Sequence, residues 1–345
     1  MARREFLYLG AGGLGVLSSE LFGRDADDGA RPDGVSVGSL VRVDDAEGGV
    51  KIETDTYEAV VTPHGHYRTG VLGGTFLDKK TGARDLGHGL NVTDYPCVPP
   101  VPGDTKSQGD PLIYGSRKLL VGVEGPQLCC AGGARIEFDV ARERTFAVVH
   151  ETFTFRRPDG EPGSRWDEWL LFPSGKRYFF AFNKLTSARK YTGLTLGGDW
   201  PGHVKAENIP LLEKVYLSYH GEIPVSEFDH TFPPDTRFFY QRSSPNIPER
   251  MIRAYRIRVQ DKPGPWLGCL TLDPSMMWQG WCHRREWVCF IGLLGGVNVE
   301  PGESFSNVNL IGFFDSIDEM NDVYDRYKCS TDAVTAADLF RFIAS

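Results

Sequence analysis

Apolar and polar residues alternate along most of the chain, a pattern typical of half-buried β-strands. In residues 133–157, Ile136, Phe138 and Val140 fall on one face of an extended segment. Residues 165–187 form two aromatic-rich runs around the sequence PSGK, which predicts a β-hairpin. Further strand patterns, separated by turns rich in glycine, proline and aspartate, occupy residues 39–63, 213–221, 236–242, 251–259, 264–272, 287–296 and 306–314. The sequence therefore predicts a mostly β protein, a large antiparallel β-sandwich or supersandwich.

Helical periodicity is confined to the C-terminal part of the chain. In residues 315–328, Ser316 followed by Glu319 forms a capping box. Apolar residues then recur at helical spacing: Ile317, Met320, Val323, Tyr324 and Tyr327. A second short helix is predicted over residues 332–344, so the sandwich is expected to carry one or two C-terminal helices. No internal repeat is present, which disfavours propellers and solenoids.

The N-terminal segment differs from the rest of the chain. A twin arginine, Arg3 and Arg4, precedes a short apolar run rich in glycine, and this combination predicts a twin-arginine export signal of a bacterial protein. A frayed apolar terminus is the alternative. A charged, glycine-rich tether follows the run. We expect residues 1–35 to be signal and tether, and residues 36–345 to form a single catalytic domain that works in the periplasm or outside the cell.

Composition narrows the possible partners. The chain has 345 residues, and its apolar content of 41% and charged content of 24% are ordinary for a soluble globular protein. Its net charge of -8 disfavours a nucleic-acid partner, and no membrane span is expected after removal of the signal. There are seven cysteines without a CxxC pair, which disfavours a zinc ribbon or a dense disulfide framework. Buried thiols are expected, with one isolated disulfide as the alternative.

Two segments resemble a known fold family. Residues 71–89, with an apolar strand before the turn sequence DKKTG, look like the opening hairpin of galactose-mutarotase-like β-supersandwiches. Residues 299–314, with the sequence PGE before a strand, are similar to a late edge and return strand of these domains. The resemblance implies a carbohydrate-active enzyme, because this family includes sugar epimerases, glycoside hydrolases and polysaccharide lyases.

Aromatic and basic residues gather in residues 281–287. In an extended segment Trp281, His283, Arg285 and Trp287 share one face, and Arg284 lies on the other. Indoles stack on sugar rings and arginines bind carboxylates, so this segment predicts a groove for an acidic sugar. A solvated strand whose aromatic residues pack under a loop is the alternative.

A histidine pair occurs in residues 62–70, with the sequence TPHGHYRTG. If this segment is extended, His64, His66 and Arg68 share one face. Two imidazoles can bind a metal, but Arg68 would repel a cation and a third ligand is missing. We therefore predict no metal and no other cofactor, keep a divalent metal as an alternative, and assign His66 and Arg68 to substrate binding.

Three further segments offer groups for proton transfer. Tyr219 and His220 end a predicted strand, and His203 lies in a Pro-Gly loop. The strand over residues 251–259 places Arg253 and Tyr255 on one face. A structural role is the alternative for each histidine.

A polysaccharide lyase that cleaves uronate-containing glycan by β-elimination is the function these residues favour. Such an enzyme needs a base, an acid and a group that neutralises the substrate carboxylate. The predicted catalytic residues are His203, Tyr219, His220 and Tyr255. The predicted substrate-binding residues are His66, Arg68, Arg253, Trp281, His283, Arg284 and Arg285. The expected partner is an acidic polysaccharide or oligosaccharide.

Two alternatives stay open. A glycoside hydrolase would use a carboxylate pair, for which Glu151, Asp167 and Glu168 are candidates. A non-catalytic exported protein that binds glycan is the other.

Overall fold

The computed structural model describes residues 41–46, 48–99, 121–129, 135–228, 238–242, 246–284 and 287–328. All of them belong to one compact unit, Ser39–Ser345. The predicted export signal and tether, the predicted second C-terminal helix and Arg285 lie outside the described residues.

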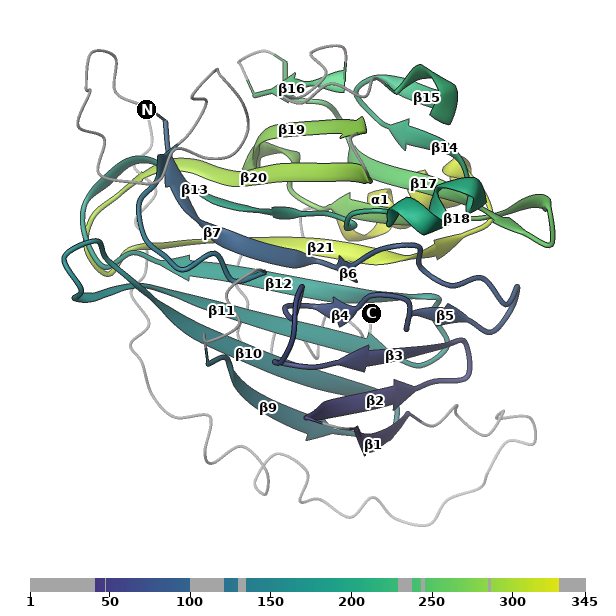
Figure 1. Cartoon of the computed structure of the whole chain (residues 1–345), viewed down its shortest axis with the longest axis horizontal. Coiled ribbons are helices and arrows are strands. Elements are labelled where there is room, and N and C mark those ends of the chain that lie inside the picture. Colours follow the sequence, from purple (N-terminus) through teal and green to yellow (C-terminus); the bar gives the residue numbers. More distant parts are fainter. Residues whose placement is uncertain are drawn as a thin grey trace, which may run out of the picture. The chain divides into compact units, whose positions relative to one another are not determined.

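The largest sheet is antiparallel and has nine strands (Figure 1). Its strand order is β15 (Gly221–Pro224), β14 (Leu212–Leu217), β17 (Met251–Val259), β18 (Lys262–Thr271), β21 (Ser304–Phe314), β12 (Tyr178–Thr186), β11 (Pro162–Pro173), β10 (Phe146–Arg156) and β9 (Glu137–Arg142). The predicted hairpin corresponds to β11 and β12, and the long run over residues 133–157 divides between β9 and β10.

Two smaller sheets are also antiparallel. One has the order β16 (Tyr240–Gln241), β19 (Met277–Arg284), β20 (Val288–Val299), β13 (Tyr191–Asp199), β7 (Val92–Val98) and β8 (Val121–Gly122). The other has the order β1 (Arg42–Ala46), β2 (Gly49–Glu53), β3 (Tyr57–Val61), β4 (Val71–Leu72) and β6 (Gly89–Leu90), with β5 (Leu77–Asp78) paired to β3. We call them the β13–β20 sheet and the β1–β6 sheet.

Both smaller sheets pack on the same face of the nine-stranded sheet. Tyr57 of the β1–β6 sheet lies 6.4 Å from Phe172 between ring centroids, and Tyr255 lies 5.8 Å from Phe290 of the β13–β20 sheet. One continuous apolar cluster includes all four of these side chains. Because each strand turns alternate side chains inward, the observed architecture is the predicted β-sandwich.

The opposite face of the nine-stranded sheet is covered by α1 (Ile317–Tyr327). Ser316 caps this helix, since its Oγ accepts a hydrogen bond of 3.1 Å from the Glu319 backbone N–H. Met320, Val323 and Tyr324 are buried against the sheet, which confirms the predicted helical face. Short 3₁₀ turns occur at η2 (Ala206–Leu211), η3 (Val225–Glu227) and η5 (Pro274–Met276). Among the described residues, no helix has the length and apolarity needed to span a membrane.

Residues 62–70 differ from the extended geometry considered above. β3 ends at Val61, and the chain then bends, with positive φ at Gly65 (92°), Tyr67 (52°) and Gly70 (72°). An extended placement of His64, His66 and Arg68 on one face is therefore wrong. The physical reason is that Pro63 ends the strand and the glycines readily adopt left-handed backbone conformations.

Candidate active site

The outward face of the β13–β20 sheet carries polar and aromatic side chains. On β19, Cys282 points into the core, whereas Trp281 packs with Cys289 and Ile291 on the outward face. Strand alternation places His283 on the same outward face as Trp281, and both side chains are fully buried. The sequence pattern therefore predicted the opposite faces of Trp281 and Cys282 correctly.

His203 is held at the end of β13. Asp199 is the last residue of that strand, and its Oδ2 lies 3.3 Å from Nε2 of His203. The backbone carbonyl of His203 accepts a hydrogen bond of 2.9 Å from the N–H of His88, and Val204 N–H donates to Val288 O at 2.9 Å. These backbone contacts bring residues 88, 203 and 288 together although they are far apart in the sequence.

Four rings meet around this point. Tyr67 stacks on His88 with 4.7 Å between ring centroids and meets the edge of His203 at 6.2 Å. Trp287 stacks on His203 and meets the edge of His88, both at 6.4 Å. His66 lies 5.8 Å from Tyr67. We call His66, Tyr67, His88, His203, His283 and Trp287 the histidine cluster.

The histidine cluster runs from the surface into the protein. His66 is exposed, Tyr67, His88 and Trp287 are half-buried, and His203 and His283 are buried. Burial, with His283 and His88 nearby, lowers the pKa of His203 to about 3. Burial and the charge of Lys205 also lower the pKa of His88. His203 is therefore neutral at neutral pH.

The two ring nitrogens of His203 have different surroundings. Nε2 lies 3.3 Å from Oδ2 of Asp199, so this side of the ring faces a carboxyl group. Nδ1 has no hydrogen-bond partner in the part of the chain that the structure describes. A carboxyl group beside one ring nitrogen and a second nitrogen without a partner are features of many acid–base sites.

Three predicted site residues, His66, His203 and His283, come together in this cluster. Tyr67 and His88 were not among the predicted site residues, and Trp287 was predicted only to share the groove face with Trp281 and His283. His88 lies between two glycines, as in a loop, and this was the available sequence signal. The missing information was the bridge between Gly87 and Val204, which is a contact between distant segments.

The other predicted residues lie elsewhere. Arg253 and the Tyr219 hydroxyl are buried on the core side of the β13–β20 sheet. The buried Tyr255 hydroxyl accepts a hydrogen bond of 3.2 Å from Leu86 N–H. His220 is exposed, with its ring edge-on to Phe238 at 5.0 Å. These residues do not join the histidine cluster.

Two predicted arginines also have distinct surroundings. Arg68 is 2% exposed, and the charge of Glu151 acts on it. Arg284 is half-buried at the end of β19, and its Nε has no hydrogen-bond partner among the described residues. In the sequence, Arg284 lies three residues before Trp287, which belongs to the histidine cluster.

The carboxylate candidates form an internal pair. Glu151 and Glu168 face each other across β10 and β11, are fully buried and hydrogen-bond to each other. Both accept the N–H of Gly70, at 3.2 and 3.1 Å, and Asn91 donates to Glu168. Burial raises the pKa of Glu151 to about 8 and that of Glu168 well above its usual range. Two carboxyls in direct contact leave no space for a glycosidic bond between them.

Asp167 lies on the other side of β11. It accepts hydrogen bonds from Arg165 at 2.7 Å and contacts His150 at 3.1 Å, and these partners hold its pKa below the usual range despite its burial. It therefore serves as an ion-pair partner. Among the described residues, no group of three or more His, Cys, Asp or Glu side chains is arranged to hold a metal ion.

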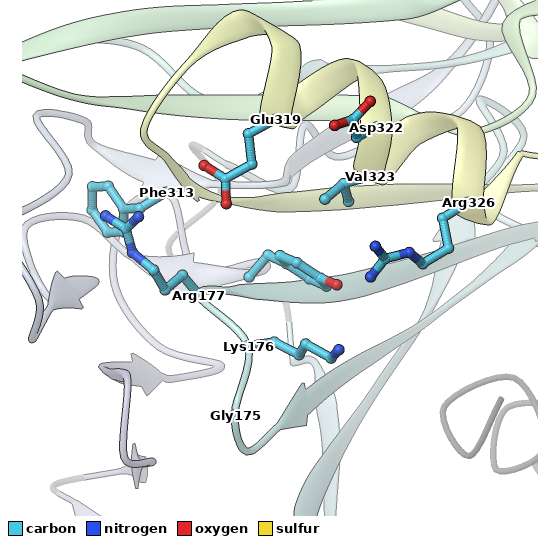
Figure 2. Close-up of a pocket in the computed structure, with 9 residues that line it drawn as sticks. Gly175, Lys176, Arg177, Phe313, Glu319, Asp322, Val323 and Arg326 are labelled. Carbon is cyan, nitrogen blue, oxygen red and sulfur yellow. The ribbon is translucent and has the colours of Figure 1, made fainter.

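A separate pocket of about 300 Å³ lies between α1 and the turn before β12 (Figure 2). Its lining includes Lys176, Arg177, Glu319 and Arg326, and the ends of Lys176 and Arg326 are directed toward the same space. Arg177 is engaged by Asp78 and Asp315, each at 2.7 Å. The pocket shares no residue with the histidine cluster and contains no histidine, so we do not assign acid–base chemistry to it.

No family model matches the sequence, and no curated protein matches it. The fold is similar to solved structures at low sequence identity. A putative aldose 1-epimerase from Klebsiella pneumoniae has a TM-score of 0.47 and 11% identity, over 81% of this chain and 83% of that one. Galactose 1-epimerase from Lactobacillus acidophilus has a TM-score of 0.41 and 9% identity, over 81% and 100%. A heparan sulfate lyase mutant from Pedobacter heparinus has a TM-score of 0.35 and 11% identity, over 84% and 38%.

Proposed function

We propose that the protein is a carbohydrate-active enzyme that works by proton transfer at the histidine cluster, and that its reaction is β-elimination on a uronate-containing glycan. The observation that carries the proposal is the Asp199–His203 pair, whose Nδ1 is without a partner among the described residues, beside Tyr67 and Trp287. A neutral imidazole beside a carboxyl group, next to a phenol and an indole, suits proton abstraction from a sugar.

Each group has a distinct task in this reaction. His203 is neutral at neutral pH and removes the proton next to the substrate carboxylate, because the negative charge of the bound substrate raises the low pKa of the imidazole in the complex. Tyr67, in edge contact with His203, donates a proton to the leaving oxygen. Trp287 is half-buried and offers an indole surface to a sugar ring.

Elimination also requires a cation for the substrate carboxylate. Lys205 follows His203 by two residues, and its charge already acts on His88. Arg284 is the second candidate, because its Nε lacks a partner among the described residues. Either group would stabilise the negative charge that develops when the proton leaves. This assignment requires no cofactor.

The test is incubation of the full chain with a panel of uronate-containing glycans. An unsaturated product gives new ultraviolet absorbance, and its appearance would support β-elimination. Release of reducing ends without new absorbance would favour a glycoside hydrolase. Binding without any change in the glycan would favour a non-catalytic binding protein, and either of these results would overturn the proposal.

We further propose export by the twin-arginine route to the periplasm or the cell exterior. The support is the arginine pair before the apolar run at the N-terminus. Replacing Arg3 and Arg4 by lysine should retain the protein in the cytoplasm of a bacterial host, as measured by cell fractionation. Unchanged export of this double variant would contradict the proposal.

A further inference from the structure

A buried carboxylate ties together the chain segment between β4 and β6. Asp85 is 2% exposed, and its carboxylate accepts hydrogen bonds from three backbone N–H groups of this segment. Oδ1 accepts from Phe76 at 2.9 Å, and Oδ2 accepts from Gly74 at 2.8 Å and from Gly87 at 3.3 Å. Because the donors lie on both sides of Asp85 in the sequence, this one carboxylate joins the start of the segment to its end.

The end of the segment pairs with the residues around His203. Gly87 forms an antiparallel bridge with Val204, and the N–H of His88 donates to the His203 carbonyl at 2.9 Å. The position of Gly87 therefore affects where the backbone of His88 meets that of His203. Asp85 binds the N–H of Gly87, one residue before His88.

Close packing couples the two ends of the segment. A methyl group added to Gly73 would lie 2.4 Å from the Gly87 carbonyl oxygen and 2.4 Å from the His88 carbonyl carbon. A methyl group added to Gly87 would lie 2.9 Å from the His203 carbonyl oxygen. The backbone at residues 73, 87 and 203 is thus in direct contact, so a shift at one of these points displaces its neighbours.

Asp85 is ionised at neutral pH. Burial raises its pKa to about 6, while the three N–H groups and the charge of Lys205 act in the opposite direction. The Tyr255 hydroxyl accepts the N–H of Leu86 at 3.2 Å, and burial together with the charge of Asp85 raises the pKa of this phenol well above its usual range. The ionised carboxylate is the form that binds backbone N–H groups most strongly.

We propose that Asp85 is a positioning residue of the histidine cluster. It binds the N–H groups of Gly74 and Gly87 and so holds the backbone of His88 in place. That backbone position places the His88 ring where Tyr67 stacks on it, at 4.7 Å between ring centroids. In the proposed function, on which this assignment rests, Tyr67 donates a proton to the leaving oxygen, and Asp85 acts on it through His88.

The variant Asp85→Asn tests this role in the full chain at neutral pH. An amide has one acceptor oxygen in place of two, so it cannot bind Phe76 on one side and both glycines on the other. We expect kcat on the best glycan to fall by roughly 10- to 100-fold with a smaller change in KM, because catalytic groups lose their alignment. Asp85→Ala removes all three hydrogen bonds and should lose more, so the amide should restore part of the loss.

The ring signals of isotope-labelled histidine, followed by NMR, provide a readout that needs no turnover. The His88 signals, assigned by their loss in His88→Gln, should shift in Asp85→Asn. The signals of His150 on β10, outside the histidine cluster, should keep their native positions. A general loss of structure would instead move both sets of signals.

Glu124→Gln is the matched control. Glu124 is also a buried carboxylate that accepts a backbone N–H, from Ser164, and it lies outside the histidine cluster. This variant should keep the native His88 signals and the native kcat, even where its unfolding midpoint falls.

Two results would overturn the inference. One is a set of native His88 signals in Asp85→Asn, whatever the activity. The other is an equal kcat for Asp85→Asn and the native protein on a glycan that the native protein cleaves. Absence of turnover by the native protein would contradict the proposed function alone, because the His88 signals would still show whether Asp85 places this ring.

Discussion

At the residue scale, the histidines differ in burial and in neighbouring groups, and these surroundings determine their acid–base properties. Burial and two neighbouring imidazoles lower the pKa of His203, whereas His220 is exposed in the turn after β14. Both histidines were predicted to be catalytic, because each lies next to a glycine near a strand end. Burial and ring contacts are long-range properties, so they could not be predicted from these local patterns.

The first prediction concerns His203 itself. His203→Gln keeps a polar side chain but cannot take a proton, so we expect kcat to fall by roughly 10²- to 10⁴-fold, with a smaller change in KM. Initial rates on the best glycan of the panel measure this. His64→Gln is the control, because the His64 ring lies beside Gly48 and outside the cluster. Equal rates for the native protein and His203→Gln would contradict the assignment.

The second prediction concerns the pair Glu151 and Glu168. The folded-state pKa of Glu151, about 8, lies above its ordinary value of 4.5, so the folded protein holds a proton that the unfolded chain releases in this range. The stability contribution is complete below about pH 4.5 and is lost as pH rises through about 8. Chemical denaturation across this range should show a decline on the order of a few kcal/mol.

Glu151→Gln provides the control for this decline. The amide resembles the protonated carboxyl in shape and can donate a hydrogen bond to Glu168. Between roughly pH 5 and pH 8, the window between the two pKa values, this variant should therefore lose less stability than the native protein. The same slope in both proteins would show that the pair does not share a proton.

At the element scale, regular elements with local signals were predictable and the bent segment was not. The capping box at Ser316 and the apolar face of α1 were read from neighbouring residues, as was the hairpin of β11 and β12. The bend in residues 62–70 depends on a left-handed backbone conformation at Tyr67, which sequence patterns do not predict for a tyrosine. That bend is what brings Tyr67 onto His88.

A prediction at this scale tests the helix cap. Ser316→Ala removes the acceptor for the Glu319 N–H, so the free energy of unfolding should fall by about 1 kcal/mol. Asp322→Ala, on the exposed face of α1, should change it by less than about 0.5 kcal/mol. Urea denaturation measures both variants. A loss at Asp322 as large as that at Ser316 would argue against a specific capping contribution.

At the scale of the whole molecule, the fold was predictable and the assembly of the site was not. Alternation identifies strands and their buried faces, and this was enough for an antiparallel sandwich. The histidine cluster instead joins residues 66–67, 88, 203, 283 and 287, which meet because β13, β19, β20 and the chain around β6 adjoin. Only the pairing of distant strands supplies that information.

The last prediction follows from where the core is built. The buried residues of the described apolar clusters begin at Val50, and the partly buried ones that pack on them begin at Val41. Removal of residues 1–35 should therefore leave the unfolding midpoint and the activity on glycan unchanged, because no described core contact is lost. Thermal unfolding and the glycan assay on the shortened and full chains measure this. A shortened chain that unfolds at lower temperature would place part of the folded domain within residues 1–35, against the predicted boundary.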